Sequence, residues 1–185
     1  MGADIHGFVE YSWEKLGKDK LWCPVPSPTP NYDGEHDRGW KLPRSYYLFG
    51  KLAGVRAEAG VYPKYQPRGL PKDIGADAFS YFTTRIARFG ESPVNNGEEY
   101  TITQAQAQVW ERRGRRLLSP DRIMSMDFHT HSWLMCHELK NVFEEELAAT
   151  DEENQLPSAY LEVVTSMEKL VADGCIARFV FGFDN

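Results

Sequence analysis

The sequence predicts an α+β fold, in which a small mixed or antiparallel sheet with central N- and C-terminal strands is packed by several helices. Residues 4–13 alternate between two faces with the period of two that is typical of a strand. Residues 175–183 form an almost wholly apolar run, which indicates a strand covered on both faces. Because strands at opposite ends of the chain would be natural neighbours, we predict a single domain over residues 1–185.

The connecting segments are assigned from helical spacing and from turn residues. Residues 46–53 predict a short helix that ends at Gly54, and residues 134–147 and 157–173 predict longer amphipathic helices. The segment 76–125 is expected to be a variable insertion. Within and before it we expect Pro/Gly-rich loops at 24–37 and 63–75, a helix at 76–89, a turn at 92–97 and a polar helix at 103–116.

Composition and charge exclude several classes of protein. The chain has 185 residues, with 21 Lys and Arg against 27 Asp and Glu, which gives a net charge of −6. This acidity argues against sequence-independent binding of double-stranded nucleic acid. No apolar run approaches the roughly 18–20 residues of a membrane span, and the N-terminus has no signal-peptide pattern. We therefore expect a cytoplasmic protein without a membrane partner, and leave a homo-oligomer open.

The three cysteines do not form a recognisable motif. Cys23, Cys136 and Cys175 are odd in number and widely spaced, and no CxxC pair occurs. This pattern predicts reduced, mostly buried thiols.

A first group of polar side chains lies in the N-terminal strand. Asp4, His6 and Glu10 are expected on one face, because alternate residues of a strand share a side. They could form the rim or floor of a polar pocket. The alternative is an ordinary solvated strand face.

A second group is the run from Asp127 to Ser132, which reads DFHTHS. If the run is extended, Asp127, His129 and His131 share one face. Two imidazoles and a carboxylate suit a divalent metal, acid–base chemistry or phosphate contacts. The alternative is that these residues cap the following helix, with Ser132 as N-cap.

A third group combines arginine with aromatic side chains. Arg44, Tyr46, Arg56 and Arg68 lie in or beside the short helix and the second loop. Arginine forks suit phosphate or carboxylate groups, and aromatic rings suit bases. The alternative is that each arginine pairs with a carboxylate of the protein.

The chain resembles a family of uncharacterised phage and bacterial proteins that begin MGCDIH. The resemblance is carried, in order, by MGADIHGFVE (1–10), RSYYLFGKLAGVR (44–56), PRGLPKDI (67–74), DFHTHSWL (127–134) and RFVFGFDN (178–185). This chain departs from the family pattern at Ala3, which replaces the usual cysteine, and at Ser45 and Tyr47. The family brings no known activity, but the resemblance implies that its blocks, which contain all three polar groups and Asp184, hold the functional site.

Three hypotheses about function follow. The first is a phage-type accessory protein that binds, and thereby sequesters, a small phosphorylated, nucleotide-like ligand such as a host defence signal. Its ligand-binding residues would be Asp4, His6, Glu10, Arg44, Tyr46, Arg56, Arg68, Asp127, His129, His131 and Ser132.

The second hypothesis is a metal-dependent phosphodiesterase or other hydrolase. A divalent metal held by Asp127, His129 and His131 would activate water, and the catalytic residues would be His6, His129 and His131. The third is a structural module that binds a partner through the basic tract 112–116 and through Glu144, Glu145 and Glu146.

Overall fold

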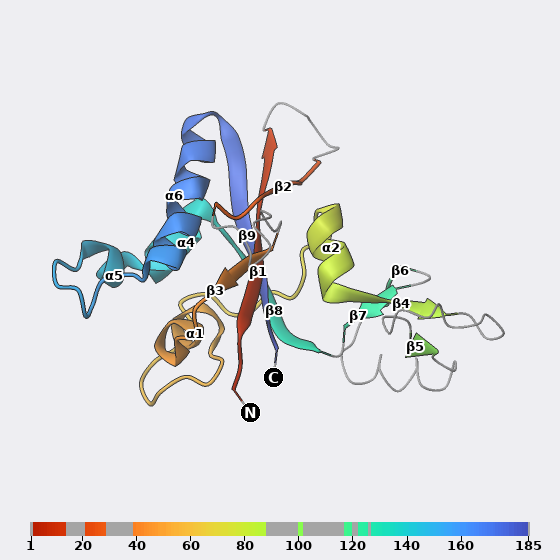
Figure 1. Cartoon of the computed structure of the whole chain (residues 1–185), viewed down its shortest axis with the longest axis horizontal. Helices are drawn as coiled ribbons and strands as arrows, with labels where there is room; N and C mark the ends of the chain where they lie inside the picture. Colours follow the sequence, from red (N-terminus) through yellow and green to blue (C-terminus); the bar gives the residue numbers. More distant parts are fainter. Residues whose placement is uncertain are drawn as a thin grey trace. The chain divides into compact units, whose positions relative to one another are not determined.

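A computed structural model of the chain describes residues 2–13, 21–28, 39–87, 100–101, 117–119, 122–125 and 127–184. The chain divides into two compact units, and Figure 1 shows the whole chain. One unit consists of Met1–Ala78 and His129–Asn185, and the other of Phe79–Phe128. The second unit covers nearly the same residues as the predicted insertion, whose variability among relatives stays a prediction.

The first unit is built on a five-stranded sheet, with the order β2-β1-β9-β8 and with β3 also paired to β1. Strand β1 (Ile5–Trp13) runs antiparallel to β9 (Cys175–Asp184) along its whole length, from Ile5 opposite Phe183 to Trp13 opposite Cys175. Strands β2 (Cys23–Val25) and β3 (Trp40–Leu42) pair antiparallel with β1, and β8 (Phe128–Met135) lies beside β9. The predicted sheet with central terminal strands is confirmed.

One face of this sheet carries the hydrophobic core. Four helices accompany the sheet: α1 (Tyr46–Ala53), α4 (Cys136–Val142), α5 (Glu144–Ala148) and α6 (Ser158–Ala172). Phe179, Phe181 and Phe183 alternate along β9 and pack with buried side chains of α1, α4 and α6. Because strand side chains alternate, the residues between them point to the opposite face. There β1 and β9 place polar groups: His6 and Glu10 on β1, and Arg178 on β9.

The predicted helices are confirmed in two cases. Helix α1 has the expected bounds. Its N-cap is Ser45, whose Oγ accepts a hydrogen bond from the Leu48 amide. It ends at Gly54, which adopts the left-handed φ of 71° that glycine tolerates best. Helix α6 follows Pro157 and ends before Gly174, as the placement of these two residues predicts.

Two other helix predictions were wrong in extent. Helix α2 (Ala76–Phe82) ends where the sequence turns β-branched, and β4 (Thr83–Ala87) replaces the rest of the predicted helix 76–89 as far as Ala87. The predicted helix 134–147 begins two residues late, because β8 continues to Met135. It is then interrupted at Phe143, which has a φ of −102° and a ψ of 20° and separates α4 from α5.

Further short strands occur in a predicted loop and in segments for which no element was predicted. In β2, Pro24 pairs with Glu10 of β1, and β2 is an edge strand, the position in a sheet that proline tolerates. In the second unit, β4 pairs with β7 (Arg122–Met124) and β5 (Tyr100–Thr101), and β7 pairs with β6 (Leu117–Ser119). The predicted turn 92–97 and helix 103–116, with its basic tract, lie outside the described residues.

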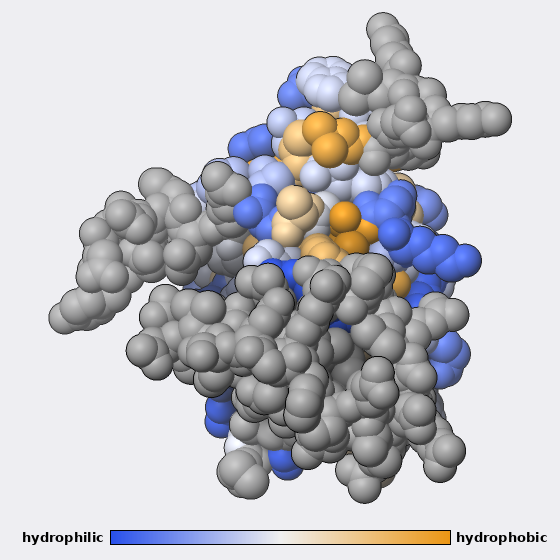
Figure 2. All heavy atoms as spheres, turned by 90° about the vertical axis from the view of Figure 1, so that its right-hand side faces the viewer, coloured by the Kyte–Doolittle hydropathy of each residue, from blue (hydrophilic) through white to orange (hydrophobic). Residues whose placement is uncertain are grey.

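Apolar residues on the described surface are scattered. In the view of Figure 2, small hydrophobic groups lie between hydrophilic residues. The large apolar side chains that are most exposed include Leu21, Tyr62, Trp13 and Val171. None of the described helices is long and apolar enough to cross a membrane.

Candidate functional site

The polar face of the sheet is organised around Arg178, which is 2% exposed. Its Nε donates to Glu10 Oε2 at 2.9 Å, and its Nη1 donates to Asp73 Oδ1 at 2.7 Å. The guanidinium carbon lies 3.7 Å from the centre of the Trp22 ring, and the Trp22 indole N–H donates to Asp73 Oδ2. This network is charge-paired and hydrogen-bonded, which is the condition for burying an arginine.

The pKa values of the two carboxyl groups in this network, Glu10 and Asp73, are shifted in opposite directions. Burial raises the pKa of Glu10, in spite of the neighbouring guanidinium. Partial burial also acts to raise the pKa of Asp73, but hydrogen bonds from Arg178 and Trp22 outweigh it and hold this pKa below its ordinary value. Neutral pH therefore favours the ionised form of Asp73.

The same network fastens the loop 63–75 to the sheet. The Gly75 amide donates to Glu10 Oε1, and a Cβ at position 75 would lie 2.5 Å from that oxygen, so this approach requires glycine. On the side of β8, the amides of Arg68 and Gly69 donate to Ser132 Oγ and to the His131 carbonyl. Ser132 is therefore a strand residue that holds the loop, and the alternative of a helix N-cap is wrong.

Arg68 already has a carboxylate partner. Its two terminal nitrogens donate to Glu138 at 2.8 and 2.5 Å, and its guanidinium lies over the Trp133 ring at 4.8 Å. The hydrogen bond from Arg68 and one from the Met135 amide outweigh desolvation and hold the pKa of Glu138 below its usual value. This arrangement matches the alternative in which an arginine pairs with a carboxylate of the protein.

A second polar group lies where β1 begins and β9 ends. We call Asp4, His6, Arg44 and Asp184 the terminal cluster. Arg44 donates two hydrogen bonds to the Asp4 carboxylate at 2.9 and 2.8 Å, with both side chains about half exposed. Asp184 accepts from the Asp4 amide and, through its second oxygen, from His6 Nε2 at 3.0 Å. Three predicted site residues thus meet here, joined by Asp184.

Three further side chains extend this cluster. The guanidinium of Arg56 lies 6.0 Å from the centre of the Tyr46 ring, and Tyr46 also contributes electrostatically to the raised pKa of Arg44. Arg56 is exposed, and no described carboxylate lies within ion-pair distance of it. The strand register places Lys41 of β3, also exposed, directly opposite His6. Arg56 has a φ of 47°, a strained conformation for a residue other than glycine.

The two histidines of the run from Asp127 to Ser132 are not related by simple strand alternation. Thr130 between them has a φ of 49°, a region that β-branched residues rarely adopt, so the segment is not regularly extended here. His129 stacks on Phe183 at 6.1 Å between ring centres, and its Nδ1 lies 2.8 Å from Thr130 Oγ1. His131 is 4% exposed. The prediction that both share a face with Asp127 depended on an extended backbone and loses that support.

The predicted metal ligands are divided between the two units. Asp127 belongs to the unit Phe79–Phe128, where Ser125 Oγ donates to its carboxylate at 3.3 Å, whereas His129 and His131 belong to the other unit. Within the described residues no three His, Cys, Asp or Glu side chains are grouped so that they could hold a metal ion. The metal-dependent hydrolase stays a prediction.

Sequence reasoning missed three of the charged residues described above. Arg178 and Asp73 lie in blocks of the family resemblance, and a cation within the apolar C-terminal run was a signal that it needs buried partners. Lys41 lies in a segment for which no element was predicted, although Trp40 and Leu42 on either side are buried and show strand alternation. Conversely, Glu146 was predicted to be part of an acidic partner-binding surface but is buried and accepts a hydrogen bond from Lys51 at 2.7 Å.

The description of the candidate site rests on this structure alone. Comparison of the chain with protein-family models, with curated proteins and with solved structures finds no match.

Proposed function

We propose that the protein binds a small phosphorylated, nucleotide-like molecule at the end of the sheet where β1 begins, and that it holds this molecule without converting it. The binding surface, here called the anion patch, consists of His6, Lys41, Arg44, Tyr46 and Arg56. The observation that carries the proposal is the state of Arg56, an exposed guanidinium over an aromatic ring with no described carboxylate partner.

Charge supports this assignment. The patch contains three cationic side chains, Lys41, Arg44 and Arg56, whereas the terminal cluster supplies two carboxylates, Asp4 and Asp184. An acidic protein therefore has a local excess of positive charge here, which attracts small anions through a focused field. The Arg44–Asp4 pair is half exposed, so its contribution to stability is small. A phosphate can replace Asp4 on the Arg44 fork at little cost.

The aromatic ring and the backbone strain support the same surface. The Tyr46 ring lies 6.0 Å from the Arg56 guanidinium, and Tyr46 follows Arg44 by two positions in the chain, so a base can stack on the ring while the guanidinium groups contact phosphate oxygens. Strained residues such as Arg56 persist where the surrounding structure maintains them, and they concentrate at functional sites. Binding without turnover is favoured because no activated nucleophile has been identified in the patch.

The test is isothermal titration of the full chain against cyclic nucleotides, ADP-ribose-type nucleotides and inorganic phosphate. We expect one ligand to bind with a stoichiometry of one and to be recovered unchanged by chromatography. Arg56→Ala should weaken this binding by about tenfold or more, because it removes hydrogen bonds to a charged group. Affinity should also fall as salt is added.

Lys169→Ala is the matched control, because it removes an exposed positive charge from α6, outside the anion patch. It should change the affinity less than twofold. The proposal is wrong if no member of the panel binds, or if a variant lacking both Arg44 and Arg56 binds as well as the unaltered chain. Conversion of the bound nucleotide would instead favour the hydrolase.

A further inference from the structure

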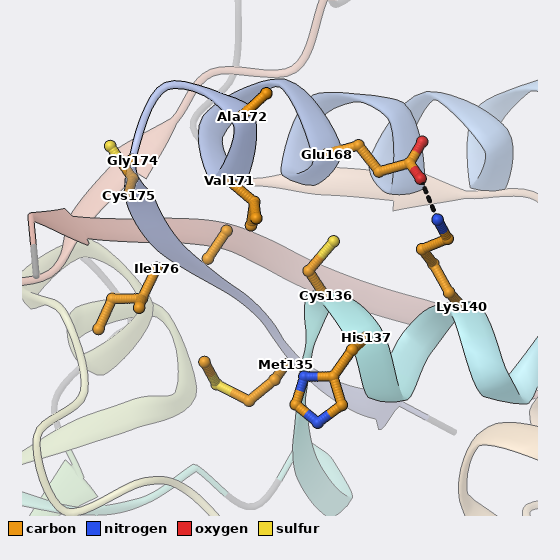
Figure 3. A pocket seen from close by; sticks show the side chains of 11 residues that line it. Met135, Cys136, His137, Lys140, Glu168, Val171, Ala172, Gly174, Cys175 and Ile176 are labelled. Atoms are coloured by element: carbon orange, nitrogen blue, oxygen red, sulfur yellow. Dashed lines mark hydrogen bonds and ion pairs between the residues drawn. The ribbon is translucent and has the colours of Figure 1, made fainter.

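A pocket of about 590 Å³ lies between α4, the C-terminal end of α6 and the start of β9 (Figure 3). This volume is within the range of small-molecule sites. None of its lining residues belongs to the anion patch or to the Arg178 network. It is therefore a separate candidate site within the same unit.

The walls of the pocket are largely apolar. Met135 ends β8, Val171 and Ala172 come from the last turn of α6, and Ile176 and Ala177 come from β9. Val171 is 46% exposed although it is a large apolar residue. An apolar ligand body that covers it would gain roughly 25 cal/mol for each Å² removed from water.

One end of the pocket is charged. Lys140 of α4 donates to the Glu168 carboxylate of α6, and Figure 3 shows this pair at the end away from Gly174 and Cys175. Both side chains are nearly half exposed, so the ion pair stabilises the fold little. The anionic group of a ligand can therefore replace Glu168 as the ion-pair partner of Lys140, and the released Glu168 carboxylate is then solvated by water. His137, on the same turn of α4, adds a second nitrogen group, whereas Glu168 is the one carboxylate among the lining residues.

Two thiols complete the lining. Cys136 and Cys175 are both buried and free, and burial raises the pKa of each thiol. They therefore stay protonated at neutral pH and behave as soft apolar surface rather than as nucleophiles.

We infer that this pocket binds a small amphipathic monoanion, with its apolar body against Val171, Met135 and Ile176 and its anionic group at Lys140. The proposal rests on the cavity, its apolar lining and the cation at one end. It is independent of the anion patch, because it uses other residues and requires an apolar ligand body.

The probe that tests it is 8-anilinonaphthalene-1-sulfonate, which joins an aromatic body to one sulfonate. We expect saturable fluorescence enhancement with one probe per chain. Lys140→Met should weaken binding of this probe about fivefold, because it removes the ion pair but keeps the apolar stem of the side chain. Binding of N-phenyl-1-naphthylamine, which lacks the sulfonate, should change less than twofold in the same variant.

Two further measurements locate the bound probe. Val171→Trp should weaken binding strongly, because the larger side chain occupies the space of the apolar ligand body, whereas Leu161→Trp, at a similarly exposed position of α6, should not. In the unaltered chain, the sulfonate probe should shift the backbone amide NMR signals of Val171 and Ile176 but leave the signal of Leu161 unaffected. If Val171→Trp does not fold, this NMR experiment decides.

The inference is overturned if native protein shows no saturable binding, if Val171→Trp binds normally, or if the NMR signals of Val171 and Ile176 do not shift when the probe is added. Equal loss of affinity for both probes in Lys140→Met would contradict the assignment of the charged end.

Discussion

At the scale of single residues, Gly7 occupies a position of the sheet that has no room for a side chain. A Cβ at this position would lie 2.3 Å from the Phe179 ring, which is itself 1% exposed and stacked on Phe181. Because a buried ring has little room to move, we expect Gly7→Ala to lower the free energy of unfolding by about 1–3 kcal/mol. Urea unfolding followed by circular dichroism measures this change.

Gly39→Ala is the matched control for this prediction. A Cβ there would meet the Phe8 ring at 3.4 Å, close to ordinary contact. The change in stability should stay within about 0.5 kcal/mol. Equal effects of the two substitutions would mean that the contact with Phe179 does not restrict position 7.

The Asp73 carboxyl gives a prediction about pH. Its pKa is lowered in the folded state, so its contribution to stability is present above its unfolded value of about 4 and is lost as the pH falls through the folded value. Glu10 has the opposite sign, because its raised pKa makes ionisation oppose folding as the pH rises. We therefore expect the stability difference between the unaltered chain and Asp73→Asn to shrink from pH 6 to pH 3. Urea unfolding at several pH values checks it, and a constant difference would contradict it.

Some side-chain arrangements in the candidate site could not be predicted from the sequence. The sequence places His129 and His131 two positions apart, and strand alternation then predicts one shared face. The left-handed backbone conformation of Thr130 breaks this alternation. The conformational propensity of threonine, which is β-branched, does not predict such a conformation. The arginines were predicted to be binding groups, but whether each is already paired depends on carboxylates far away in sequence, such as Glu138 for Arg68.

At the scale of elements, Arg178 joins β9, β1 and the loop 63–75. Arg178→Ala leaves the Glu10 carboxyl buried without its partner, so we expect a loss of about 3–5 kcal/mol in unfolding free energy. The double variant Glu10→Leu/Arg178→Met should recover much of this loss, because both charges are replaced by apolar groups. Urea unfolding of Glu10→Leu, Arg178→Met and the double variant gives the coupling energy. Additive losses would show that the two residues act independently.

The elements themselves were predictable where local signals agreed. Helix α1 has a capping serine and a terminal glycine, and β1 and β9 have unambiguous strand patterns. The boundary between α2 and β4 was missed because Phe82 and Ile86 continue a helical spacing while Thr83 and Thr84 favour a strand, and pairing with β7 decides the outcome. Such pairing joins distant residues and is invisible to a local pattern.

At the scale of the whole molecule, the hydrophobic cluster that contains the phenylalanines of β9 is built from residues of the unit formed by Met1–Ala78 and His129–Asn185. We expect this unit to fold after Phe79–Phe128 is replaced by a flexible Gly/Ser linker of about ten residues. Thermal unfolding should stay cooperative, and nucleotide binding at the anion patch should persist. Loss of the cooperative transition would show that the core depends on the excised segment.

The antiparallel pairing of the first and last strands has a consequence for biosynthesis. Glu10 and Arg178 are hydrogen-bonded across 168 positions of sequence, so β1 leaves the ribosome long before its central neighbour is translated. Until then its apolar face is exposed on the nascent chain, where edge-to-edge association competes with folding. Closure of so long a loop also makes the final step slow. Any chaperone that shields β1 until β9 emerges would limit this competition.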